Sequence, residues 1–194
     1  SQRRHSPRQR MTPMRALLIA GALFAASLPA LAANYTQAAG STLGFTVRYQ
    51  DEPFKGTFPG FATRLTFDPA KLAQARLEVV IPLANATIGP DYDSDMRGSD
   101  FFDAAKFPQA RFSASKFRAL GGNRYAADGT LTLRGVSKPV TFTFTWTPGA
   151  KPVLVGTATV KRLDFGVGRG DWADPSMIAN EVKVDTRVVL QPAK

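Results

Sequence analysis

Five aspartates lie close together in residues 90–108, and their carboxylates are the groups of this chain best suited to chemistry: Asp91, Asp93, Asp95, Asp100 and Asp103. The first three have the alternate spacing that opens a calcium loop. Met96 stands where such a loop needs glycine, and Phe102 stands where it needs a bidentate glutamate. A carboxylate pair could also hydrolyse a glycoside, but aspartates in turns and helix caps are far commoner. We therefore expect no metal site here.

Imidazole and thiol groups do not occur in the part of the chain that is expected to fold. The one histidine is His5, and the chain has no cysteine. Ser-His-Asp and Cys-His nucleophile systems need an imidazole to move the proton, and zinc and copper sites use imidazole and thiolate ligands. We expect a protein that is not an enzyme and uses no metal or cofactor. A carboxylate-dependent enzyme is the alternative, and it requires two Asp or Glu facing each other in a cleft.

Residues 1–32 have the order of a secretory signal peptide. Arginines up to Arg15 precede an apolar run at 16–28, and Ala30-Leu31-Ala32 provides a cleavage site before Ala33. The run is shorter than the roughly 20 residues that cross a bilayer. We therefore assign residues 1–32 to an upstream extension plus a cleaved signal peptide, and residues 33–194 to a single domain exported to the periplasm.

Removing residues 1–32 also changes the charge of the chain. That segment holds five of the 25 Lys and Arg and none of the 15 Asp and Glu, so the formal net charge falls from +10 to +5. The remaining basic residues are scattered and form no cluster of the kind that binds a polyanion. We therefore do not expect nucleic acid as a partner.

The folded part of the chain has hydrophobic side chains at every second position. The pattern is clearest in residues 130–146, where Gly135 and Pro139 suggest a hairpin connection between two strands. Similar runs at 43–50, 61–67, 76–83, 110–117, 153–164 and 181–190 bring the number of strands to about eight. Frequent Gly and Pro between them favour an all-β antiparallel sandwich or barrel.

Residues 90–108 interrupt this pattern and predict a short helical insertion. Its aromatic residues Phe101, Phe102 and Phe107 are close enough together to cover one end of a barrel. An eight-stranded barrel is either filled by its own side chains or holds one small ligand. The small residues Gly156 and Ala158 would leave room inside, although Gly156 could instead mark a bulge.

Several motifs resemble the YceI-like family. They are Phe61–Asp68, Met96–Phe112, Asp128–Val140 and Arg162–Gly166, in the expected order along the chain. The resemblance implies an eight-stranded antiparallel lipocalin-like barrel that is not catalytic and binds polyisoprenoid chains, including quinone tails, in an interior tunnel. Members of the family usually carry a histidine near the first strand and another at its end. Here those regions read Gln37–Ser41 and Arg48-Tyr49, so tail binding is a firmer expectation than head-group binding.

The expected function is that of an exported carrier or reservoir for a long isoprenoid lipid or quinone, with transient membrane contact. Alternation predicts a wall made of Phe45, Val47, Phe67, Ile81, Phe112, Leu133, Phe142, Phe144 and Trp146. At the mouth we expect Phe101, Phe102 and Trp172, with Arg97 and Asp100 as polar residues that either contact a head group or fix the insertion through an ion pair or cap. The alternative is a non-catalytic interaction module with a packed barrel, serving a membrane redox partner.

Overall fold

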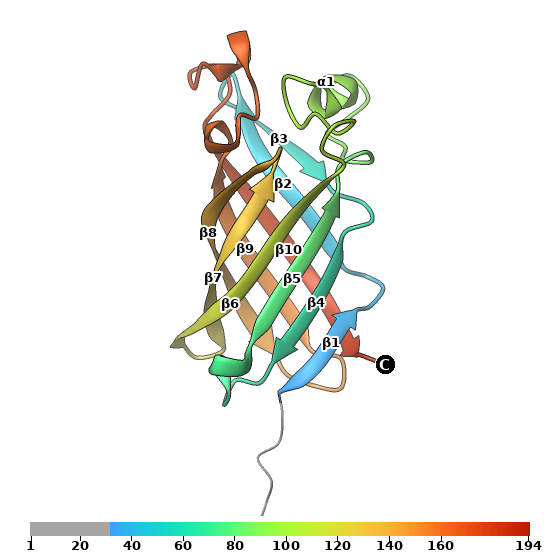
Figure 1. The fold of residues 1–194 in the computed structure, drawn as a ribbon, viewed down its shortest axis with the longest axis vertical. Helices are drawn as coiled ribbons and strands as arrows, with labels where there is room; N and C mark the ends of the chain where they lie inside the picture. Colours follow the sequence, from blue (N-terminus) through green and yellow to red (C-terminus); the bar gives the residue numbers. More distant parts are fainter. Residues whose placement is uncertain (1–31) are drawn as a thin grey trace, which may run out of the picture. The chain divides into compact units, whose positions relative to one another are not determined.

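The computed structural model describes residues 32–194, so the segment that carries the predicted signal peptide lies outside the described residues except for Ala32. This part of the chain is almost entirely antiparallel sheet (Figure 1). The strands are β1 (Ala33–Gln37), β2 (Thr42–Tyr49), β3 (Glu52–Thr57), β4 (Ala62–Phe67), β5 (Arg76–Pro82), β6 (Gln109–Gly121), β7 (Arg124–Leu133), β8 (Val136–Thr147), β9 (Val153–Lys161) and β10 (Glu181–Pro192). None of the helices formed by residues 32–194 is long and apolar enough to cross a membrane.

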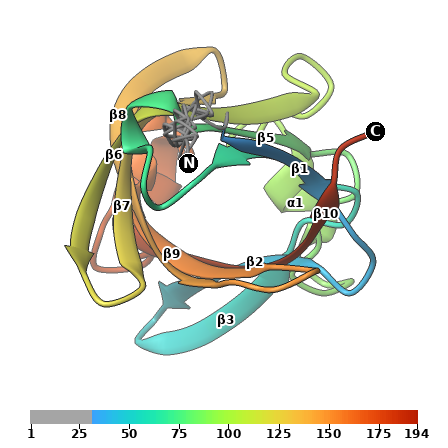
Figure 2. The ribbon, with the colours of Figure 1, turned by 90° about the horizontal axis from the view of Figure 1, so that it is seen from below.

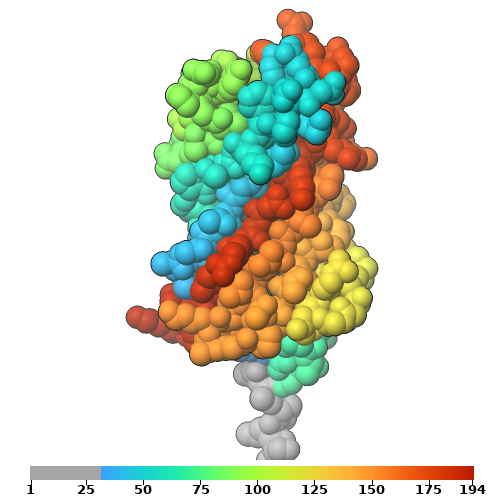
Figure 3. Space-filling view, turned by 180° about the vertical axis from the view of Figure 1, so that it is seen from behind, coloured from blue at the N-terminus to red at the C-terminus, as the bar shows by residue number. Residues whose placement is uncertain are grey.

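Eight of these strands close into a barrel. The hydrogen-bonded order runs β1-β4-β5-β6-β7-β8-β9-β10, and β10 returns to pair with β1 (Figure 2). The long β10 also pairs with β2 nearer its start, and β2 carries β3 as a hairpin. Figure 3 shows β10 crossing the outer wall diagonally between β9 and the blue segments of β1 and β2. The expected eight-stranded antiparallel barrel is confirmed.

The β7–β8 hairpin turns over two residues, fewer than the sequence suggests. Arg134 and Gly135 both have positive φ angles, 53° and 74°, as a tight type I′ turn requires. Pro139 lies inside β8, opposite Thr130, and is not part of the turn. Its missing N–H is tolerated because β9 pairs only with the later part of β8, from Thr143 onward.

One end of the barrel is filled by six aromatic side chains, here called the aromatic plug. Phe67 is 1% exposed at its centre, and its ring centroid lies 4.8 Å from that of Trp146 and 5.6 Å from that of Phe144. The other members are Tyr35, Phe117 and Tyr125. Tyr125 directly follows the β6–β7 turn, so the plug closes the end of the barrel that lies lowest in Figure 1.

The opposite end, the mouth, is covered by three segments (Figure 1). They are the β2–β3 turn, residues 83–108 with the five-residue helix α1 (Asp93–Arg97), and residues 162–180 with the 3-10 helices η2 (Arg162–Phe165) and η3 (Gly170–Ala173). The Arg134 guanidinium donates hydrogen bonds to the carbonyl oxygens of Ser99 and Gly166, both at 2.7 Å. The β7–β8 turn thus ties the second and third segments together.

Candidate functional site: an apolar cavity below the mouth

A cavity of about 290 Å³ lies inside the barrel between the mouth and the plug. Every barrel strand except β1 contributes to its wall, and so do β2, β3 and the second and third mouth segments. Besides apolar and aromatic residues, the lining contains only Thr63, Asp95, Arg162 and Thr186. The interior is therefore not filled by side chains, and it suits a long apolar ligand.

Phenylalanine rings packed over glycines shape this wall. The Phe45 ring occupies the space where a side chain at Gly56, its partner across β2 and β3, would stand. The Phe142 ring covers Gly156 in the same way, and the Phe112 ring covers Gly129. Because each glycine has no side chain, each ring can lie close to the sheet. Gly156 pairs in register with Phe144 and Thr186, so it accommodates a ring and does not mark a bulge.

Half-buried aromatic side chains surround the mouth and form an aromatic rim. Tyr49 lies 5.9 Å from Phe54, 6.5 Å from Tyr92 and 6.4 Å from Trp172 between ring centroids, and Phe101 lies 5.8 Å from Trp172. Tyr92 is 44% exposed. The rim therefore combines apolar ring faces with polar hydroxyl and indole groups where the cavity meets solvent.

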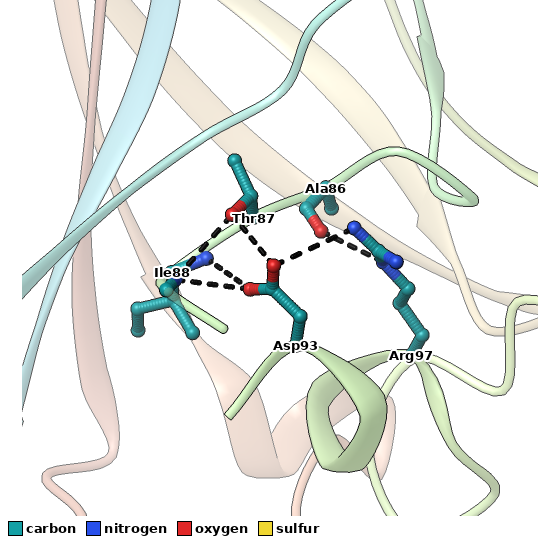
Figure 4. A network of polar contacts seen from close by, with 6 residues as sticks. Ala86, Thr87, Ile88, Asp93 and Arg97 are labelled. Carbon is teal, nitrogen blue, oxygen red and sulfur yellow. Dashed lines mark hydrogen bonds and ion pairs between the residues drawn. The ribbon is translucent and has the colours of Figure 1, made fainter. Parts of the chain in front are cut away.

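A network of polar contacts holds residues 86–97 over the mouth (Figure 4). The Asp93 carboxylate accepts hydrogen bonds from the Ile88 N–H at 2.7 Å, the Gly89 N–H at 3.0 Å and the Thr87 hydroxyl at 2.8 Å. The Ile88 backbone hydrogen bond is the main reason that the Asp93 pKa falls below its ordinary value. Arg97 donates to the Ala86 carbonyl oxygen at 2.9 Å and lies 3.7 Å from the Asp93 carboxylate. Both side chains therefore fix the insertion.

A buried arginine holds the third mouth segment. Arg162 is 3% exposed, and its guanidinium donates to the carbonyl oxygens of Val167 at 2.9 Å, Ile178 at 2.6 Å and Ala179 at 3.0 Å. Within residues 32–194 no carboxylate lies within ion-pair distance of it. Burial lowers the Arg162 pKa. This side chain thus fastens the two ends of a loop while lining the cavity.

Most of the residues expected at a binding site surround this cavity. Nine of the fourteen line it: Phe45, Val47, Ile81, Phe101, Phe102, Phe112, Leu133, Phe142 and Trp172. Phe67, Phe144 and Trp146 do not, because they point inward at the level of the plug. Arg97 and Asp100 are also absent from the lining; the Asp100 carbonyl oxygen accepts hydrogen bonds from Gly168 and Arg169. Whether any of the fourteen touches a ligand stays a prediction.

Sequence reasoning missed several lining residues. Phe54 belongs to β3, where Pro53 and Gly56 conceal the strand pattern. Arg162 has a charge that suggests a position outside the barrel. Thr63 was detectable, because it alternates with Leu65 and Phe67 and so shares their inward face. Asp95 is the one carboxylate among the lining residues, so the cavity wall does not contain the carboxylate pair that glycoside hydrolysis requires.

Comparison with known proteins identifies relatives of this barrel. A model of the YceI-like domain matches residues 35–190. A UPF0312 protein of Vibrio parahaemolyticus is 28% identical over 186 residues, which cover 87% of this chain and 98% of the relative.

Solved structures are similar as well. The crystal structure of Burkholderia cenocepacia BcnA is 35% identical, with a TM-score of 0.74 over 77% of this chain and 95% of that one. A polyisoprenoid binding domain from Saccharophagus degradans, implicated in plant cell wall breakdown, has a TM-score of 0.63 at 15% identity. The match covers 84% of this chain and 99% of that domain, and it supports the fold alone.

Proposed function

The chain belongs to the YceI-like family, and on that premise we propose that it binds a long isoprenoid lipid without catalysing a reaction on it. The observation that carries the proposal is the closed barrel with an apolar cavity below the mouth. The domain from Saccharophagus degradans, which has the same fold, is described as polyisoprenoid binding. Burial of each methylene contributes about 0.8 kcal/mol, so affinity should rise with every prenyl unit that the cavity accommodates.

We further propose that the lipid is exchanged at a membrane in the periplasm, with quinones among the candidate ligands. Residues 1–32 have the composition of an export signal. The aromatic rim supports membrane contact, since Tyr and Trp side chains favour the interface between lipid and water. Fractionation of cells that produce the chain with residues 1–32, followed by mass measurement of its N-terminus, tests the export step. A periplasmic product that begins at Ala33 is expected, and an uncleaved cytoplasmic product would contradict it.

Native mass spectrometry of detergent-free protein tests the binding function. We expect a bound lipid, or uptake of an added polyprenol such as solanesol. In Ala158→Phe a ring would enter the cavity from β9 and uptake should fall, whereas Thr159→Phe places the same ring on the exposed face of that strand and should bind like the unaltered protein. Failure of the unaltered protein to carry or take up any isoprenoid would instead favour an interaction module.

A further inference from the structure

The cavity wall contains one buried hydroxyl without a hydrogen-bond partner. Thr63 is 4% exposed and lines the cavity, and its Oγ1 makes no hydrogen bond with the described part of the chain. Thr186, the other threonine in the lining, donates to the Thr42 carbonyl oxygen at 2.7 Å. A buried polar group without a partner is costly and uncommon, so the Thr63 hydroxyl requires an explanation.

Thr63 lies toward the closed end of the cavity. Leu65 and Phe67 follow it on the same inward face of β4, where Leu65 is 2% exposed and does not line the cavity and Phe67 is the centre of the plug. Thr63 is therefore the last β4 side chain in the cavity wall before the plug. A ligand atom that reaches Thr63 has entered deeply.

A second polar atom without a partner belongs to the strand beside Thr63. The β1–β4 register pairs Tyr35 with Leu65 and Thr36 with Arg64, so its next step places Gln37 opposite Thr63. Gln37 donates from Nε2 to the Phe61 carbonyl oxygen at 3.0 Å, while its Oε1 is buried without a partner. Gln37 is not among the residues that line the cavity, so Thr63 is the residue that can present an unpaired polar group to a ligand at the floor.

We propose that Thr63 forms a floor subsite for the terminal hydroxyl of a prenyl alcohol, which enters the cavity with its oxygen first. An alcohol both donates and accepts a hydrogen bond, so it can pair with the Thr63 hydroxyl, which a hydrocarbon end cannot do. One staggered rotation about χ1 moves the Thr63 hydroxyl to the position of its methyl group and the methyl group to the position of the Cβ hydrogen. That rotation breaks no hydrogen bond, because the hydroxyl has none in the wall. The inference rests on the proposed function and specifies its ligand class.

Titration with a matched pair of ligands tests the subsite. The probes are an all-trans prenyl alcohol and the hydrocarbon with the same number of prenyl units. One hydrogen bond should give the unaltered protein a preference of roughly threefold to tenfold for the alcohol. Thr63→Ser, which keeps the hydroxyl, should retain this ratio. Thr63→Val should lower this ratio to near one while still binding the hydrocarbon. Thr159→Val, on the exposed face of β9, should leave the ratio unchanged.

The carbonyl stretch of a bound prenyl aldehyde reports the contact directly. It should lie at lower frequency in the unaltered protein and in Thr63→Ser than in Thr63→Val. If both lipids bind and neither the ratio nor the frequency changes in Thr63→Val, the subsite is wrong and the binding function stands. If the unaltered protein binds neither lipid, the binding function fails and the subsite fails with it.

Discussion

The ring of Phe142 occupies the space where a side chain at Gly156 would stand, so these two residues together set the width of the cavity. A Cβ atom at Gly156 would overlap the ring and come within 2.8 Å of the Thr143 carbonyl oxygen. The sheet backbone surrounds this point on both sides, since β9 pairs with β8 and β10 here. Only the ring has room to move, and the room lies in the cavity.

Gly156→Ala should therefore weaken both folding and lipid uptake. Displacing a packed ring costs about 1–3 kcal/mol of the free energy of unfolding, and the displaced ring narrows the cavity. Urea denaturation and solanesol uptake measure the two effects. The control is Val155→Ala, on the outer face of the same strand, where the side chain is 49% exposed. Equal uptake by the two variants would show that Phe142 does not limit the cavity.

Protonation of Asp93 should make the stability of the α1 segment depend on pH in the acid range. Its pKa is lowered in the folded protein, chiefly by the Ile88 hydrogen bond, so its stabilising contribution is present above the ordinary carboxyl pKa and is lost as the pH falls through the lowered value. Amide exchange at Ile88 and Gly89, corrected for the intrinsic rate, should be constant near neutral pH and rise below about pH 4. Asp93→Asn should show faster exchange at neutral pH and no such rise. Loss of protection already near pH 6 would contradict this origin.

Arg162 should contribute far more to the stability of the protein than Arg169, which lies in the same mouth segment but is exposed. Arg162→Met keeps a long apolar side chain but leaves buried carbonyl oxygens of Val167 and Ile178 without donors. Each such group costs about 1–3 kcal/mol, so this variant should lose several-fold more stability than Arg169→Met. Chemical denaturation compares the two. Similar losses would mean that solvent replaces the guanidinium at these carbonyl groups.

The strands could be predicted from the sequence because each barrel strand has one face toward the interior. The predicted runs omit two strands: β1, which closes the barrel, and β3, where Pro53 and Gly56 read as turn residues. Gly56 belongs in a strand here because the Phe45 ring from β2 fills the space beside it, and this contact depends on a pairing that the local sequence does not specify.

The site was harder to predict because alternation gives the direction of a side chain but not its height in the barrel. Phe142 and Phe144 share the inward face of β8, and their stacked rings lie 5.7 Å apart. One lines the cavity and the other belongs to the plug. Arg162 was missed for another reason: its hydrogen-bond partners are backbone carbonyl groups of a loop, which leave no signature in residue types.

Phe142 and Phe144 therefore form a matched pair that separates ligand binding from core packing. Phe144 is 2% exposed within the plug, so Phe144→Leu should lose about 1–3 kcal/mol of stability while the order of preference among prenyl chain lengths stays the same. Phe142→Leu removes a ring that already faces the cavity, so it should lose less stability and shift the preference toward longer or bulkier chains. Urea denaturation and competition among polyprenols of graded length measure both properties. A shift in preference of equal size in both variants would mean that the plug is part of the binding site, and the lipid would then have to reach Phe67.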